Sequence, residues 1–286
     1  MNVSPDEGPC AILGLGLIGG SIARDLAVRN VRVFGFDTDA QTLSAARRAR
    51  VISRVVDESL EQLREARMVI LAVPVDAAAD LLTRAAPFLG NATLITDVGS
   101  TKGTIVAHAQ ALKLGEKFVG SHPLTGDHRS GWTAARRASF LRAKVFVCPT
   151  RTSLPATIKL AHAFWRSLGA LPVNMAAKTH DAEMAYTSHL PHLLSAALAR
   201  TLSRANHPRS ALGAGGRDAT RLASSSPEMW SAIVAANGPN ITRALDAYLK
   251  ELRQLRKAAS SGDAAAIHEL FTATTAWAGP VPRQKT

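Results

Sequence analysis

The sequence predicts an α/β protein in which a doubly wound, mostly parallel sheet of the Rossmann type is followed by an all-helical domain. Two observations predict this fold class. Short apolar runs alternate with segments of helical spacing from Ala11 to about Met175, as in a sheet whose parallel strands are joined by helices. After Ala177 the strand-like runs disappear and long helical patterns follow. We therefore expect one domain over residues 1–176 and a second, helical domain over residues 177–286.

Strands are expected where apolar residues run together without helical spacing. In chain order these runs cover residues 10–13, 31–36, 68–73, 93–98, 117–120, 144–148 and 171–174. In the second half, apolar residues at helical spacing are separated by Gly-rich or Pro-bearing breaks. These helical patterns cover residues 180–206, 227–237, 239–260 and 263–277.

A glycine motif joins the first expected strand to the first helical segment. Gly14, Gly16 and Gly19 form G-x-G-x-x-G, and the helical pattern begins near Gly20. The first glycine allows a tight turn, the second lets backbone N–H groups approach a pyrophosphate, and the third lets helix and strand pack closely. Asp37 ends the second strand, at the distance where a dinucleotide-binding unit places the acid that binds the adenosine ribose. A glycine-rich turn in an ordinary α/β domain is the alternative, but the order of strand, glycines, helix, strand and acid favours nucleotide binding.

The expected cofactor is NAD. A carboxylate at Asp37 can accept hydrogen bonds from both ribose hydroxyls, and it would repel the 2′-phosphate of NADP. Leu17 and Ile18 lie inside the glycine motif and belong to the same predicted site. Val73 and Pro74 end a later strand, where the chain would pass the adenine side of a bound dinucleotide.

Two further strand ends carry polar residues, and ligands of open α/β sheets bind beyond the carboxyl ends of the strands. Ser100 follows the run at 93–98, in reach of the nicotinamide region, and His122 follows the run at 117–120. Pro123 holds His122 in an extended conformation at the mouth of the predicted site. A lone histidine is more often an ordinary surface residue, but this position favours a role in the site.

The helical half adds two groups of candidate ligand contacts. His189 and His192 lie three residues apart on one helical face, next to Ser188. No H-E-x-x-H motif or Cys/Asp cluster accompanies them, so we expect a core or substrate contact and no metal. Arg217 and Arg221 follow a glycine loop, where an arginine can clamp a carboxylate bidentately. A helix cap with solvated arginines explains the same loop equally well.

Composition limits the partners and the compartment. The net charge is +12, but the basic residues are spread along the chain without interleaved aromatics, so we expect no nucleic-acid partner. No segment resembles a signal peptide or a transmembrane helix, so we expect no membrane partner. Cys10 and Cys148 are the only cysteines, and both lie in apolar runs. Two reduced, buried thiols in a cytoplasmic protein are therefore expected.

Taken together, these residues resemble the prephenate and arogenate dehydrogenase family of tyrosine biosynthesis. The resemblance runs from about Cys10 to Ala276, with the family's motifs in the family's order. The matching segments are GLGLIGGS at 14–21, DVGSTKG at 97–103, GSHPLTG at 120–126, the HD and SHLPH elements within 180–192, and RDATRLASSSPEMW at 217–230. The resemblance implies an NAD-dependent oxidoreductase that decarboxylates prephenate to 4-hydroxyphenylpyruvate, and a homodimer built on the helical half.

The resemblance also implies a role for each candidate residue. His122 would accept a hydrogen bond, and ultimately the proton, from the C4 hydroxyl of a small anionic cyclohexadienyl substrate. A neutral histidine near its ordinary pKa suits that task. Ser100 would orient His122 and the hydroxyl beside the nicotinamide, and Arg221 would bind a substrate carboxylate. The residues implied to line the same pocket are Ser188, His189, His192 and Trp230.

The sequence departs from the family at two places. Asp127-His128 stands where the family often has threonine or serine followed by glutamate, and Gly216 stands where it often has an aromatic residue. The first departure leaves room for a variant substrate, so arogenate and 4-amino-4-deoxyprephenate remain alternatives to prephenate. A hydroxyacid dehydrogenase would usually need a catalytic lysine in the helical half. A basic nucleotide-binding protein without catalysis would need no organised His122, Ser100 and Arg221.

Overall fold

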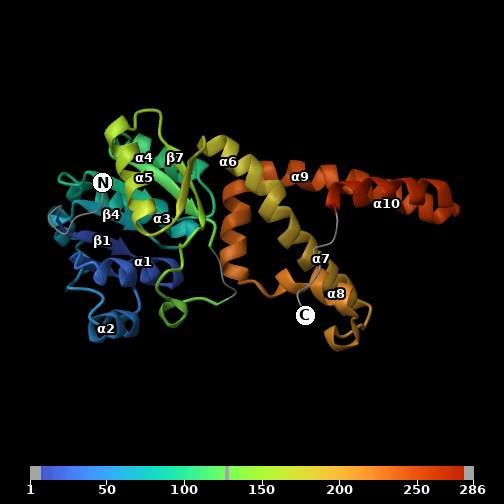
Figure 1. The fold of residues 1–286 in the computed structure, drawn as a ribbon, viewed down its shortest axis with the longest axis horizontal. Coiled ribbons are helices and arrows are strands. Elements are labelled where there is room, and N and C mark those ends of the chain that lie inside the picture. Colours follow the sequence, from blue (N-terminus) through green and yellow to red (C-terminus); the bar gives the residue numbers. More distant parts are fainter. Residues whose placement is uncertain (1–7, 126–128, 280–286) are drawn as a thin grey trace. The chain divides into compact units, whose positions relative to one another are not determined.

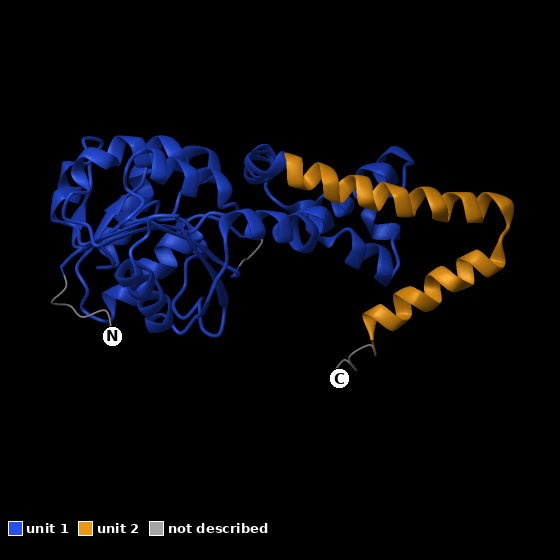
Figure 2. Cartoon of the chain, turned by 90° about the horizontal axis from the view of Figure 1, so that it is seen from above, with its two compact units in different colours: residues 1–238 blue, residues 239–286 orange. Residues whose placement is uncertain are grey.

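The computed structural model describes residues 8–125 and 129–279 of the chain (Figure 1). It divides into two compact units, Met1–Gly238 and Pro239–Thr286 (Figure 2). The first unit contains every strand of the described residues, and the described part of the second is helical. The domain boundary predicted near Ala176 lies inside the first unit, between its last strand and the helices that follow, and it stays a prediction.

Five parallel strands form the main sheet, in the order β3-β2-β1-β4-β5. Their bounds are β1 Cys10–Leu13, β2 Val33–Phe36, β3 Arg54–Val55, β4 Met68–Leu71 and β5 Leu94–Asp97. Leu13 pairs with both Phe36 and Leu71, and Leu71 pairs with Asp97. The carboxyl ends of four strands therefore lie level at one edge, where a Rossmann sheet binds its ligand.

A three-stranded sheet continues the structure, in the order β6-β7-β8. The strands are β6 Val119–Pro123, β7 Lys144–Pro149 and β8 Leu171–Asn174, with β6 antiparallel to β7 and β7 parallel to β8. A parallel bridge between Ile95 and Phe118 joins this sheet to the main one. Because β6 therefore runs in the direction of β5, its carboxyl end, which carries His122, lies at the same edge as the end of β5.

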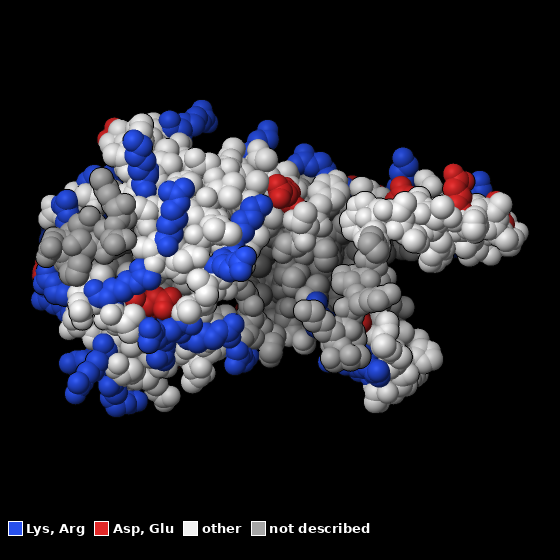
Figure 3. Space-filling view, in the orientation of Figure 1, with Lys and Arg blue, Asp and Glu red and all other residues white. Residues whose placement is uncertain are grey.

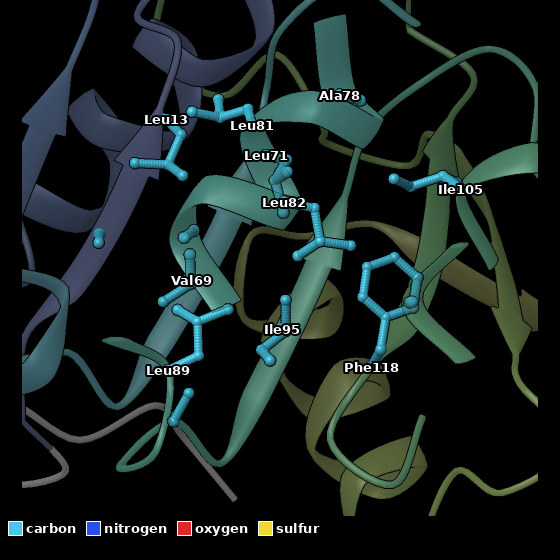
Figure 4. Close-up of a cluster of buried hydrophobic side chains, with 14 of the residues drawn as sticks. Leu13, Val69, Leu71, Ala78, Leu81, Leu82, Leu89, Ile95, Ile105 and Phe118 are labelled. Atoms are coloured by element: carbon cyan, nitrogen blue, oxygen red, sulfur yellow. The ribbon is translucent and has the colours of Figure 1, made fainter. Parts of the chain in front are cut away.

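Helices connect the strands and cover both faces of the main sheet. They are α1 Leu17–Ala27, α2 Ala40–Arg48, α3 Val75–Ala85, α4 Gly103–Ala111 and α5 Pro155–Ser167. Alternate residues of each strand enter different apolar clusters, as the period of two in a strand requires. Leu13 and Leu71 belong to one cluster, drawn in Figure 4, whereas Ile12 and Ile70 belong to the other. Burial on both faces explains why these strands read as continuous apolar runs.

The rest of the described chain is helical. Its elements are α6 Ala177–Met184, a π-helical turn Ala185–His189, α7 Leu190–Arg204, α8 Ala214–Ala219, a 3₁₀ turn Arg221–Ser224, α9 Pro227–Ser261 and α10 Ala264–Ala278. The backbone of Asn237 is non-helical (φ −125°, ψ 21°), and Pro239 follows it inside α9. A proline cannot donate the helical hydrogen bond, which accounts for the kink at this place.

The predicted fold class, a mostly parallel Rossmann-type sheet followed by helices, is confirmed. Two details differ. Strand β6 extends to Pro123, beyond the predicted 117–120, because His122 and Pro123 pair with Phe146 and Val145 of β7. Strand β3 was not predicted, since two residues are too few to show a strand period.

The positive charge is dispersed on the one face of the molecule that Figure 3 shows. On the face shown in Figure 3, Lys and Arg side chains are spread, with acidic side chains and uncharged surface between them. No helix among the described residues is both long and apolar enough to cross a bilayer.

Candidate active site

The glycine turn between β1 and α1 is built so that each glycine meets a different constraint. Gly14 has a φ of +98°, and a Cβ there would lie 2.4 Å from the carbonyl oxygen of Ala72. A Cβ on Gly19 would lie 1.9 Å from the carbonyl oxygen of Gly14. A Cβ on Gly16 would meet no atom within 4 Å. The first and third glycines are therefore required by the protein's own packing, whereas the open space at Gly16 is free for a ligand to approach the backbone.

Asp37 binds this turn directly. Its carboxylate accepts hydrogen bonds from the backbone N–H of Leu15 (2.8 Å) and from that of Asp39 (2.9 Å). The side chain is half-buried at the end of β2. Asp37 therefore fixes the glycine turn, and its position beside that turn fits a dinucleotide ribose.

A buried ion pair organises the ends of β5 and β6. Asp97 is 2% exposed and forms an ion pair with Nζ of Lys102, which is fully buried. The same carboxylate accepts hydrogen bonds from the backbone N–H groups of Gly99 (2.9 Å) and Ser121 (3.2 Å). The Ser121 hydroxyl in turn accepts a hydrogen bond from the Trp165 indole (2.9 Å). These bonds lock the loop after β5 against the strand that carries His122.

His122 is held by a histidine of the helical segment. Its Nδ1 lies 2.9 Å from Nε2 of His180, and Nδ1 of His180 lies 2.8 Å from Oδ1 of Asp181. The carboxylate of Asp181 also accepts hydrogen bonds from the backbone N–H groups of Lys102 (2.8 Å) and Gly103 (2.7 Å) at the start of α4. A line of side chains therefore runs from Asp181 through the fully buried His180 to the half-buried His122.

The environment keeps His122 uncharged. Burial, and then the neighbouring His180, Lys102 and His189, hold the pKa of His122 well below its ordinary value of 6.5. The expectation of a histidine near its ordinary pKa was therefore wrong, since the sequence could not show how much of the ring is desolvated. The consequence suits a base, because the ring has a free lone pair at neutral pH.

The second predicted cluster comes together around Trp230. The His192 ring stacks on the Trp230 ring with centroids 4.2 Å apart, and the His189 ring meets it edge-on at 5.9 Å. His189 is buried on the π-helical turn, a kind of distortion frequent at functional sites, and burial lowers its pKa to about 4. The amide nitrogen of Asn237 lies 3.2 Å from Nδ1 of His189. Because an amide nitrogen only donates, the neutral His189 ring carries its proton on Nε2.

Three other predicted site residues have no contacts in the described part of the structure that define a role for them. Ser100 is half-buried in the loop after β5, and its hydroxyl makes no hydrogen bond within the described ranges. Arg221 is exposed on the 3₁₀ turn after α8. Ser188 is half-buried, and its carbonyl lies 2.9 Å from Nδ1 of His192.

The remaining predicted cofactor residues flank the sheet edge. Leu17 and Ile18 open α1, and Val73 and Pro74 lie between β4 and α3. Asp127 and His128, which depart from the family pattern, lie outside the described residues. The roles given to all these residues stay predictions.

Sequence reasoning assigned no role to His180, Asp181, Lys102 or Asn237. The first two lie in the HD element, which was recognised only as part of a motif. Their contacts with His122 and Gly103 span 58 and 78 residues, so no local period could reveal them. The sequence offered one signal for these residues, which is a charged residue inside a motif at the end of a strand. Asp97 and Lys102 are such residues.

Comparison with known proteins assigns the family. The model of the prephenate dehydrogenase nucleotide-binding domain matches residues 22–173, and that of the prephenate dehydrogenase dimerization domain matches residues 176–273. The chain belongs to the prephenate dehydrogenase family. The predicted family is therefore confirmed, and so are the predicted enzyme class and cofactor: the chain is an NAD-dependent oxidoreductase of that family.

Individual relatives from the prephenate dehydrogenase family are similar to this chain in sequence over nearly its whole length. It is 33% identical to the prephenate dehydrogenase of Bacillus subtilis, over 96% of this chain and 76% of the relative. It is also 33% identical to the cyclohexadienyl dehydrogenase of Zymomonas mobilis, over 91% of this chain and 92% of the relative. Among solved structures, the prephenate dehydrogenase of A. aeolicus in complex with hydroxyphenyl propionate and NAD+ superimposes with a TM-score of 0.84 at 28% identity. That match covers 93% of this chain and 96% of the other.

Proposed function

We propose that this enzyme oxidatively decarboxylates prephenate to 4-hydroxyphenylpyruvate, with His122 as the base. The observation that carries the proposal is the neutral, oriented His122 at the sheet edge that also holds the glycine turn. The names of the relatives support prephenate as the substrate, and the cyclohexadienyl dehydrogenase among them keeps arogenate as the second candidate.

NAD fits the residues at the sheet edge. The space beside Gly16 admits a pyrophosphate to the backbone, and the N-terminus of α1 supplies partial positive charge. Asp37 favours the free ribose hydroxyls of NAD over the 2′-phosphate of NADP. When bound, the cofactor accepts a hydride.

The residues of this chain then have two tasks, which are to position the ring and to accept one proton. As C4 of the ring gives up its hydride, the C4 hydroxyl passes its proton to the lone pair of His122. The bond between C1 and the departing carboxylate breaks to release CO2, and its electron pair enters the ring. The ring becomes aromatic, and His122 returns the proton to the phenolate oxygen. Ser100 orients the hydroxyl, and Arg221 holds a carboxylate by a charge-assisted, bidentate contact.

The cluster of the His189, His192 and Trp230 rings supplies neutral donors for an anionic substrate. The His189 ring is neutral at pH 7 and carries its proton on Nε2. The indole N–H of Trp230 is buried and has no hydrogen-bond partner in the part of the chain that the structure describes. An unpaired buried donor is costly unless a ligand satisfies it. These observations support both donors as contacts of the substrate.

The compartment is proposed as the cytoplasm. Cys10 and Cys148 are both free and buried, and burial raises the pKa of each thiol to about 12. Thiols of this kind are inert structural residues that suit a reducing environment.

The function is tested by following NADH formation and CO2 release together, with prephenate and with arogenate. We expect prephenate to give the higher kcat/KM, and His122→Asn to lower kcat by roughly 10²-fold or more while NAD affinity changes little. Faster turnover of arogenate would replace the proposed substrate. Wild-type kcat in His122→Asn would show that the proton goes elsewhere.

A further inference from the structure

The side chains behind His122 form an ordered series of donors and acceptors. We propose that Asp181 and His180 are positioning residues that hold His122 as its Nδ1–H tautomer, so that Nε2 carries the lone pair that receives the substrate proton. This inference rests on the proposed function for the role of His122 as the base. The tautomer itself can be measured without any substrate.

The direction of the series is set at Asp181. Two backbone N–H groups, of Lys102 and Gly103, already donate to its carboxylate. Burial raises the pKa of Asp181, but the hydrogen bonds from His180 and from these two backbone groups outweigh it and bring the pKa below its ordinary value. Asp181 is therefore ionised at neutral pH and can only accept.

The protons of both histidines follow from that anion. Since the carboxylate accepts, Nδ1 of His180 donates to it, and an imidazole ring with one ring proton then has its lone pair on Nε2. That lone pair faces Nδ1 of His122 at 2.9 Å, so Nδ1 of His122 is the donor. The lone pair of His122 is then on Nε2. The opposite tautomer of His122 would place two lone pairs against each other.

Buried packing keeps the series in place. His180 is fully buried, and its ring meets the Phe146 ring edge-on with centroids 5.3 Å apart. The backbone carbonyl of Asp181 accepts a hydrogen bond from the Asn237 amide (2.8 Å). A ring held in this way cannot rotate to offer His122 a donor in place of an acceptor.

The same series supports the charged form that arises during the reaction. When Nε2 of His122 takes the hydroxyl proton, the Nδ1–H bond to His180 becomes charge-assisted and stronger. Asp181 lies on the far side of His180, and its negative charge stabilises the new cation on His122. Burial, His180, Lys102 and His189 oppose this cation, and the Asp181 carboxylate behind His180 is the negative charge of the series that offsets them.

The test compares two replacements of His180 by ¹⁵N NMR of the histidine rings in the full-length protein saturated with NAD+. The resonances of His122 are identified by their loss in His122→Asn. His180→Phe removes the acceptor and keeps the ring volume, whereas His180→Gln keeps an acceptor oxygen. We expect the Nδ1–H tautomer at His122 in the wild type and in His180→Gln, and the Nε2–H tautomer in His180→Phe. Phe146→Leu, which changes the packing against His180 without removing a hydrogen bond, should leave the tautomer unchanged.

Turnover of prephenate gives the second readout. We expect His180→Phe to lower kcat by about 10- to 10²-fold, His180→Gln to recover most of that loss, and KM for NAD to stay near the wild-type value in both. Thermal unfolding of each variant separates a folding defect from a catalytic one. The proposal is overturned if His122 is the Nε2–H tautomer in the wild type, or if His180→Phe leaves both tautomer and kcat unchanged. Expected tautomers in a wild type that does not turn over prephenate would support the positioning role and overturn only the proposed function.

Discussion

Gly16 and Gly19 lie three residues apart in one motif, yet their replacement should fail in different ways. A Cβ at Gly16 meets only open space, so Gly16→Ala should fold with a free energy of unfolding within about 0.5 kcal/mol of the wild type. It should weaken NAD binding by about tenfold or more, because the methyl group would occupy the close approach of the pyrophosphate. Isothermal titration with NAD+ and urea unfolding measure the two effects.

Gly19→Ala is the matched control for this prediction. Its Cβ would lie 1.9 Å from the backbone oxygen of Gly14, so the turn or the helix must shift. We expect a loss of about 1–3 kcal/mol or more in the free energy of unfolding. Unchanged NAD affinity in Gly16→Ala would mean that the cofactor does not approach this turn.

Arg221 and Arg217 form a second pair with different expected behaviour. Both side chains are exposed, but Arg217 donates to the backbone carbonyl of Leu212 at 2.5 Å, whereas the Arg221 side chain has no hydrogen-bond partner among the described residues. Arg221→Ala should raise KM for the cyclohexadienyl substrate by roughly 10- to 150-fold, the equivalent of about 1.5–3 kcal/mol for a charge-assisted hydrogen bond. Arg221→Lys should recover only part of the loss, since lysine lacks the planar fork.

Steady-state kinetics of Arg217→Ala completes the comparison. We expect KM close to the wild-type value in that variant. A larger effect on KM at Arg217 than at Arg221 would show that the substrate carboxylate binds nearer the glycine loop, where Gly216 replaces the aromatic residue frequent in the family.

Sequence reasoning at the residue scale proposed groups that would contact a ligand and missed the groups that hydrogen-bond to them from behind. His122 could be predicted because a strand end and a following proline are visible in the sequence. Its partner His180 could not, because the contact depends on how the helical segment packs against β7. The lowered pKa of His122 has the same origin, since desolvation is a property of the packed site.

At the scale of elements, the buried ion pair between Lys102 and Asp97 joins β5, β6 and α4. Lys102→Met should lower the free energy of unfolding by about 3–5 kcal/mol, because it leaves the Asp97 carboxylate buried without its counter-charge. Urea unfolding measures the loss. Lys159→Met, at an exposed position of α5, is the control and should stay within about 0.5 kcal/mol of the wild type. Equal stability of the two variants would contradict the importance given to the ion pair.

Elements with a clear pattern of apolar residues were predicted from the sequence. Elements that are defined by hydrogen-bond pairing with a neighbouring strand were not. The run at 171–174 was expected as a strand and forms β8. The helical pattern at 180–206 also formed, but its π-helical turn was not visible, because a single wider turn changes the apolar spacing too little to be read from the sequence. The patterns at 227–237 and 239–260 form one element with a kink, where Pro239 had suggested a break.

At the scale of the whole molecule, the match to a dimerization domain supports a homodimer. In the second unit, α10 leaves Phe271 60% exposed and Trp277 90% exposed. Exposed large apolar side chains of this kind are the first candidates for the surface that a partner subunit covers. We expect light scattering at micromolar concentration to give twice the chain mass of 30.2 kDa.

The same measurement on variants locates the dimer surface. Phe271→Asp should shift the mass toward the monomer, whereas Glu269→Gln, at an exposed polar position of α10, should not. A monomeric wild type would contradict the homodimer. A fully dimeric Phe271→Asp would place the interface elsewhere.

The buried histidines also make the stability of the whole molecule depend on pH. Burial holds the pKa of His122 well below 6.5 and that of His189 at about 4, whereas both titrate near 6.5 in the unfolded chain. Below pH 6.5 the unfolded state therefore binds protons that the folded state does not. The free energy of unfolding should fall as pH decreases from 6.5 toward 4, by up to about 1.4 kcal/mol per pH unit for each histidine.

Urea unfolding between pH 7.5 and 5 isolates this effect, because most carboxylates stay ionised in both states over that range. His189→Gln should flatten the slope by about one proton, since glutamine keeps a polar side chain in the pocket but does not titrate. Because His189 must stay neutral to leave Nδ1 as the acceptor for Asn237, acid should break this hydrogen bond before it unfolds the sheet. A free energy of unfolding that stays constant from pH 7.5 to 5 would mean that both rings gain their protons as readily in the folded chain as in water.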